Sequence, residues 1–199
     1  MPNSATPGGL RSVQNMLSTG YNGAIKQFSV PAGDSTAIFI GDPVKLAGTS
    51  QFIGGVSYPD IAQAATGDVL CGVVVGFLQA DRDSLLYRAA STQRIALVDI
   101  DPNALFEIPQ VAGGTPITAN DVGLNVNFVV AAGSTVTGWS NVTLNNTTEA
   151  TTNTLDLKIV DIVNRADNDP GSAVGTGADA SHFLVRINRH VFVNQIAGV

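Results

Sequence analysis

Few side chains in this chain are suited to chemistry, and they are scattered. The 199 residues include two histidines, His182 and His190, one cysteine, Cys71, and three lysines. The histidines stand eight residues apart with Asp179 nearby, a sparse set for zinc, because zinc sites gather three or four closely spaced ligands. We interpret both histidines as polar strand or interface residues and predict no metal and no cofactor.

Two further candidates for chemistry have simpler structural interpretations. Cys71 lies in an apolar stretch, 69–78, where a free cysteine behaves as a small hydrophobe. The pattern Asp-x-Asp occurs three times, at Asp81 and Asp83, at Asp99 and Asp101, and at Asp167 and Asp169. On a strand this spacing puts both carboxylates on one face, which suits half of a calcium or magnesium site. Each pair also abuts a turn signal, where aspartates cap backbone amides, and we favour that interpretation.

The composition points away from catalysis and from nucleic acid. Only 13% of the residues are charged, and 10 Lys+Arg against 16 Asp+Glu leaves a net charge of −6. This balance lacks the basic footprint of a nucleic-acid-binding protein. The sequence has no phosphate-binding glycine motif and no Gly-x-Ser-x-Gly elbow. No apolar run reaches the roughly 18–20 residues of a membrane helix. We therefore expect no enzyme activity, no small-molecule substrate and no membrane span.

Strand signals dominate the chain. Helical periodicity is weak, and only 59–65 and 82–87 could form a turn or two of helix. Short runs rich in Val, Ile, Phe and Thr are bounded by Gly, Pro, Asn and Asp. They predict strands at 37–40, 44–46, 51–56, 69–78, 94–100, 104–108, 125–131, 142–144, 154–163, 182–188 and 191–194. Turn signals about every 8–15 residues are typical of a sandwich or barrel. We predict a mainly β fold: a compact β-barrel or sandwich of short antiparallel strands with an extended N-terminal arm and long loops.

The predicted organisation is an arm followed by one domain. Residues 1–23 are rich in Gly, Ser, Asn and Pro and form the expected arm, whose apolar anchors are Leu10, Val13, Met16, Leu17 and Tyr21. Residues 24–199 form a single β-rich domain with an exposed loop near 167–181. Within 154–163, period two places Leu155, Leu157, Ile159, Asp161 and Val163 on the core face. Phe183, Val185 and Ile187 alternate in the same way.

The surface of such a domain must be mostly hydroxyl and amide, because charged residues are few. A surface of this kind resists association less firmly than a charged one. Either much of it is covered by a partner in the working state, or it is neutral and has no partner.

An ordered set of segments resembles a known family. Residues 87–99 read YRAASTQRIALVD, and Asp101-Pro102 and Leu105-Phe106-Glu107 follow. Further along come VGLN at 122–125, AGSTVTG at 132–138, LDLKI at 155–159 and FLVRIN at 183–188. In this order they resemble the head-decoration, or capsid cement, proteins of tailed bacteriophages, over about residues 28–190.

The resemblance implies a structural virion protein on the outer surface of the capsid, made in the host cytoplasm. Such a protein clamps neighbouring subunits of the major capsid protein, commonly as a homotrimer. Candidate contacts with the capsid or with other copies are the arm anchors Leu10, Val13, Met16, Leu17 and Tyr21, together with Arg88, Arg94 and His190. Arg88 and Arg94 flank a Ser-Thr turn and would fix that loop or an intersubunit contact. The alternative is a β-rich tail or fibre-tip adhesin that binds a host surface glycan, for which Trp139 is the strongest aromatic candidate.

Overall fold

The computed structural model describes residues 8–17, 20, 23–111, 113–169, 181–194 and 198. Its regular structure is almost all β, which confirms the predicted fold class. Apart from the short 3-10 turn η1 (Ala119–Asp121), the elements are β1 (Arg11–Asn15), β2 (Ile25–Val30), β3 (Pro43–Ile53), β4 (Val56–Gln63), β5 (Gly72–Phe77), β6 (Arg94–Asp99), β7 (Ala104–Pro109), β8 (Asn125–Val126), β9 (Phe128–Val129), β10 (Thr143–Leu144), β11 (Leu157–Ile162) and β12 (His182–Ile187).

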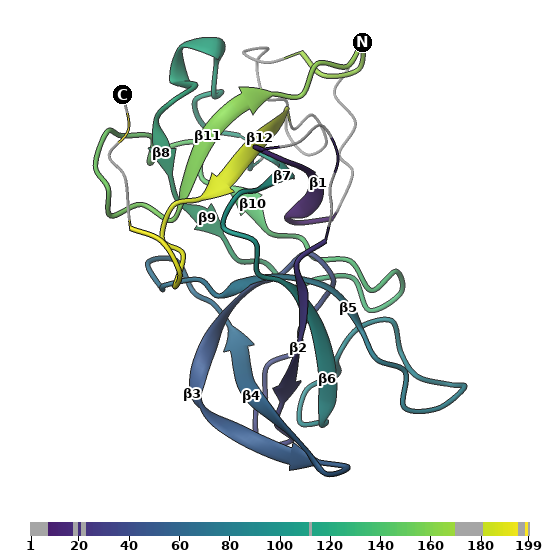
Figure 1. The fold of residues 1–199 in the computed structure, drawn as a ribbon. Helices are drawn as coiled ribbons and strands as arrows, with labels where there is room; N and C mark the ends of the chain where they lie inside the picture. The colour runs from purple at the N-terminus through teal and green to yellow at the C-terminus, as the bar shows by residue number, and fades with distance from the viewer. Residues whose placement is uncertain are drawn as a thin grey trace.

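The strands form two packed lobes (Figure 1). In the lower lobe five strands pair in the ring β2-β4-β3-β5-β6, which makes a small barrel. The ring closes where β2 lies parallel to β4, with Ser29 opposite Asp60, while its other pairings are antiparallel. The upper lobe holds a five-stranded sheet in the order β1-β7-β12-β11-β8 and the small pair β10-β9.

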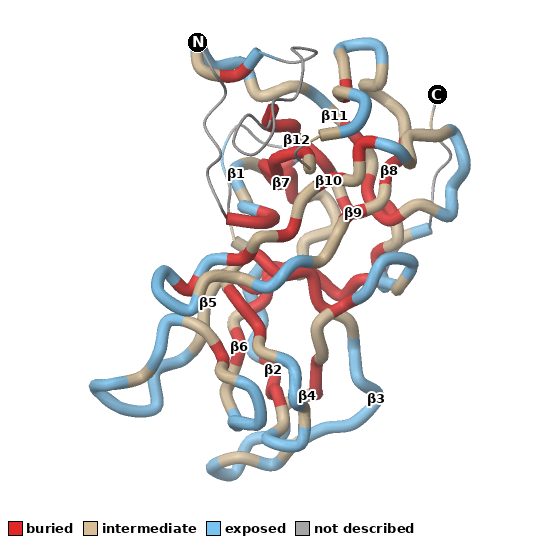
Figure 2. Tube along the Cα trace, turned by 180° about the vertical axis from the view of Figure 1, so that it is seen from behind, coloured by how far each residue is buried: buried red, intermediate tan, exposed pale blue. Residues whose placement is uncertain are grey.

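Each lobe has its own apolar core. Phe106, Leu157, Ile159 and Phe183 lie in the core of the upper lobe, and Phe28, Ile61 and Val98 in that of the barrel. Figure 2 shows this burial along the middle of the strands, with exposed loops at the periphery. The predicted core faces of β11 and β12 are confirmed at Leu157, Ile159, Phe183, Val185 and Ile187.

A β-bulge explains where that pattern fails. The register of β11 against β12 shifts between Ile159 and Asp161, so the alternation of faces changes there. Asp161, expected on the core face, is exposed.

Four local predictions are wrong. Residues 59–63 belong to β4 and 82–83 form a turn, so neither expected helical segment is helical. The strand expected at 51–56 is interrupted by a two-residue turn at Gly54 and Gly55, where β3 folds back into β4. Residues 191–194 form a turn after β12 and are not a strand.

The N-terminal region is also more integrated than expected. Leu10 is a buried member of the upper core, and β1 pairs antiparallel with β7. The Leu10 amide donates to the Gly41 carbonyl (3.0 Å), which ties the start of β1 to the chain that enters the barrel. Residues 10–15 of the expected extended arm therefore belong to the fold, because backbone pairing joins them to the sheet.

Candidate interaction surface

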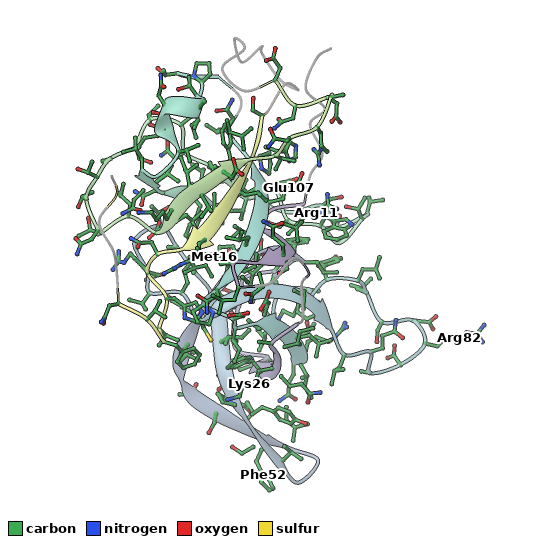
Figure 3. All side chains as sticks on the ribbon, turned by 45° about the horizontal axis from the view of Figure 1, so that its top comes forward. Arg11, Met16, Lys26, Phe52, Arg82 and Glu107 are labelled. Carbon is green, nitrogen blue, oxygen red and sulfur yellow. The ribbon has the colours of Figure 1, made fainter. Side chains whose placement is uncertain are left out.

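His182 belongs to a buried ion cluster on β7 and β12. Its Nδ1 lies 3.0 Å from Oε1 of Glu107, and Arg165 Nη1 lies 2.6 Å from the same oxygen. The hydrogen bond from His182, assisted by Arg165, lowers the pKa of Glu107 to about 2. The cluster ties the segment after β11 to the sheet. Figure 3 shows Glu107 at the upper lobe.

His190 has a different environment. It is 3% exposed and pairs with Leu70 in a short parallel bridge, and its ring lies 5.4 Å from that of Phe192. Burial lowers its pKa to about 4. Among the described residues no three His, Cys, Asp or Glu side chains are grouped as a metal site requires; Asp179 lies outside them.

The remaining candidates for chemistry have structural roles. Cys71 is fully buried, and burial raises the pKa of its thiol to about 11. Asp81 Oδ1 accepts from the Asp83 amide (3.1 Å) and Asp101 Oδ1 from the Asn103 amide (2.8 Å), which confirms the turn interpretation at these two positions.

Arg88 is fully buried and holds two loops together. Nε donates to the Thr92 carbonyl (2.7 Å), and Nη2 donates to the carbonyls of Pro31 and Asp34 (both 2.7 Å). Nη1 donates to the Thr36 carbonyl. The expectation that Arg88 fixes this loop is confirmed, whereas a direct contact with a partner is not available to a side chain in this position.

Arg94 braces a second loop. Its guanidinium lies 5.7 Å from the ring centre of Phe77, and Nη2 donates to the carbonyls of Leu78 (3.2 Å) and Leu85 (3.3 Å). These bonds hold the base of the loop 78–87, which projects from the barrel with Arg82 at its end (Figure 3).

The β3–β4 hairpin is the most unusual surface feature. Residues 46–59 contain no charged side chain. At its end Gly54 and Gly55 have φ of +60° and +87°, the conformation of a type I′ hairpin turn, which favours glycine. Beside the turn Phe52 is 77% exposed and Val56 50%, and Figure 3 shows Phe52 at the extremity of the barrel lobe.

The hairpin is also unpaired along its outer edges. β3 pairs with β5 only at Pro43 and Val44, and β4 pairs with β2 only at Asp60. At the base, the buried carboxylate of Asp60 accepts from the Thr49 hydroxyl (2.7 Å), which anchors the ribbon. Proteins normally protect such edges with charges or proline, and here only Pro59 serves that purpose. Sequence reasoning missed this surface, although the uncharged run around Gly-Gly was its visible signal.

The other predicted contact residues divide into buried and exposed groups. Leu10, Arg88 and His190 are buried, so the prediction that they contact a partner is wrong for them. Val13, Met16 and Leu17 are exposed by 37%, 48% and 82%, and their contact role stays a prediction. Tyr21 and most of the predicted loop 167–181 lie outside the described residues.

Trp139 does not stand in an aromatic cluster. In the described part of the chain the ring pairs are Phe39 with Tyr87 and His190 with Phe192, while the neighbour over the indole is the Arg11 guanidinium. A glycan-binding aromatic cluster of the kind the adhesin alternative requires is therefore not formed by these residues.

No helix in the described ranges combines the length and apolar character needed to cross a bilayer.

Comparison with known proteins identifies no relative. No family model, curated protein or solved structure matches the chain.

Proposed function

We propose that this protein is a structural decoration protein that binds the outer surface of an assembled phage head and clamps neighbouring major capsid subunits. The proposal rests on the ordered resemblance of residues 28–190 and on one structural observation. That observation is the uncharged hairpin 46–59, which presents Phe52 and Val56 to solvent at the end of the barrel.

The hairpin supports docking because its surface can be desolvated at little cost. Burying an unpaired charge is expensive, and this ribbon carries none. A phenylalanine transferred from water to a protein pocket contributes roughly 1.5–3 kcal/mol. The unpaired backbone groups of β3 and β4 could in addition pair with a strand of the partner. We therefore place the capsid contact at the hairpin 46–59.

Multivalency would strengthen a contact of this size. One hairpin is a small surface beside the roughly 800 Å² that each partner contributes to a stable interface. A homotrimer, which the resemblance implies, would present three hairpins at once, so that attachment of the first raises the effective concentration of the others. The exposed residues Val13, Met16 and Leu17 are available for contacts between copies or with the capsid.

The test is sedimentation of the purified protein with undecorated phage heads. The wild-type protein should co-sediment, and Phe52→Asp should weaken binding at least tenfold, because a charge then has to be buried at the contact. Val136→Asp is the matched control, since Val136 is 89% exposed on a different loop.

Two results would count against the proposal. If the wild-type protein does not bind heads but binds host cells or glycans, the adhesin alternative is favoured. If Phe52→Asp and Val136→Asp bind as the wild type does, the hairpin is not the contact.

A further inference from the structure

A small cleft lies where the upper sheet meets the barrel. It measures about 240 Å³ and is bounded by the start of β1, the middle of β5 and Trp139. Drug-sized ligands occupy pockets of roughly 300–1,000 Å³. This cleft is suited to a single side chain rather than to a whole cofactor.

A cationic group stands at the mouth of the cleft. The Arg11 guanidinium lies 5.9 Å from the centre of the Trp139 ring, and Trp139 is 38% exposed. This distance corresponds to a cation–π contact. A guanidinium can also bind a carboxylate through two parallel N–H groups. Within the described residues no carboxylate lies within ion-pair distance of Arg11.

The acidic residues beside this part of β1 are already engaged. Glu107, which lies opposite Arg11 in the β1–β7 register, pairs with Arg165 and His182. Ser12, beside Arg11 in the cleft, donates its hydroxyl to Asp99 Oδ2 at 2.7 Å. Oδ1 of the same carboxylate accepts from the Asp101 amide (3.2 Å). Asp99 is fully buried, so it stands behind the cleft and does not occupy the Arg11 fork.

Most of the other lining side chains are aliphatic. Leu10, Ile40, Val74 and Val75 contribute to the walls, and Ser12 is the one uncharged polar side chain among the described lining residues, although polar atoms also reach the cleft surface. Sugar hydroxyl groups set against these four aliphatic side chains would find no hydrogen-bond partner there. Val75 also has no partner on β6, because the β5–β6 register shifts between Val74 and Gly76. A bulged residue of this kind leaves backbone groups available to an extended chain.

We propose that this cleft binds an extended segment of a partner protein, with an aliphatic side chain in the cavity and an adjacent carboxylate on Arg11. The positive charge of Arg11 favours a carboxylate, and the small volume and aliphatic side chains of the cleft favour an aliphatic group. Arginine and tryptophan are also the residues that most often dominate binding energy at interfaces. The cleft is separate from the hairpin 46–59, and this inference does not depend on head binding.

Trp139 is the only tryptophan in the chain, so its fluorescence reports on this site alone. The intact protein is titrated with N-acetyl-leucine, N-acetyl-leucinamide and glucuronate. N-acetyl-leucine should give a saturable change in emission, and the amide should bind at least tenfold more weakly, because it lacks the charge-assisted hydrogen bonds. Glucuronate, a carboxylate on a polar ring, should give no saturable change.

Substitutions at Arg11 complete the test. Arg11→Gln should weaken N-acetyl-leucine binding at least tenfold, and Arg11→Lys should lose less, because it keeps the charge without the fork. Arg82→Gln, at an exposed arginine on the distant loop, should leave binding unchanged. The proposal is overturned by the absence of a saturable response, by equal binding of the amide, by glucuronate binding as tightly, or by equal effects of Arg11→Gln and Arg82→Gln. None of these results would alter the outcome of head sedimentation.

Discussion

Replacing Arg88 by methionine should destabilise the barrel lobe by about 3 kcal/mol. The substitution keeps a long side chain in the fully buried position but removes the donors to the carbonyls of Pro31, Asp34, Thr36 and Thr92. A carbonyl left without a partner costs about 1–3 kcal/mol, and we take about 1.5 kcal/mol for each of Thr36 and Thr92. The carbonyls of Pro31 and Asp34 keep backbone donors, the amides of Asp34 and Ser91, so each loses only a second hydrogen bond, worth about 0.5 kcal/mol. The two orphaned and two partly satisfied carbonyls together cost about 4 kcal/mol, of which about 1 kcal/mol is offset because no charge has to be buried.

Urea denaturation of wild-type, Arg88→Met and Arg88→Lys proteins measures this loss. A loss of about 3 kcal/mol corresponds to a melting temperature lower by about 6–12 °C for a chain of this size. The free energy of unfolding of Arg88→Lys should lie between those of the wild type and Arg88→Met, because an ammonium group has three donors but no planar fork. The exposed residue Arg82 provides the control, and Arg82→Met should change stability by less than about 0.5 kcal/mol.

A loss below about 1 kcal/mol for Arg88→Met would refute this reasoning. The loops would then be held by backbone bonds alone, such as those from Ile38 to Arg88 and from Ser91 to Asp34.

Three further predictions concern buried ionisable groups and are checked by denaturation across a pH series. The pKa of Glu107 is lowered from 4.5 to about 2, so the stabilisation by its carboxylate is present above about pH 4.5 and is lost as pH falls toward 2. Glu107→Gln should be less stable than wild type at pH 7, and the difference in stability should disappear near pH 2. Burial raises the pKa of the Asp156 carboxyl from 3.8 to about 6, so between these pH values the native state binds a proton that the unfolded state has lost. The free energy of unfolding therefore falls as pH rises through this range. The stability of Asp156→Asn relative to wild type should increase between pH 4 and 7. Burial lowers the pKa of His190 from 6.5 to about 4, so stability falls as pH drops through this range, and His190→Gln should remove that fall. A difference from wild type that stays constant with pH would refute the corresponding assignment.

The strands that sequence reasoning found are those whose side chains alternate or whose ends are marked. β6 and β7 end near Asp101-Pro102 and Pro109, and β11 and β12 carry a clear period of two. Such strands can be identified from the sequence because one face is apolar and a proline or glycine marks the end of the strand.

The strands that it missed are held by backbone pairing rather than by side-chain pattern. β1 lies at a sheet edge within a polar segment, and only Asn15 of its residues is buried. The first half of β2 is exposed at Ile25, Lys26 and Gln27, which hides its alternation. Hydrogen bonding to a neighbouring strand does not depend on side-chain type, so no local signal identifies these strands.

The site was harder to predict than the fold. Arg88, His190 and Leu10 were predicted to contact a partner, yet all three are interior. Arg88 is satisfied there by carbonyls from distant parts of the chain, and Leu10 packs into a core built from distant strands, so neither burial has a local signal. The hairpin 46–59 was readable in principle from its missing charges and its Gly-Gly turn. The pairing of Arg11 with Trp139 joins residues far apart in sequence and follows only from the fold.

The most direct test of the proposed function is a subnanometre reconstruction of phage heads saturated with the purified protein. The account predicts density on the outer capsid surface with the hairpin 46–59 directed into it and Phe52 at the contact. Heads without added outer density, or bound copies whose hairpin points to solvent, would contradict it.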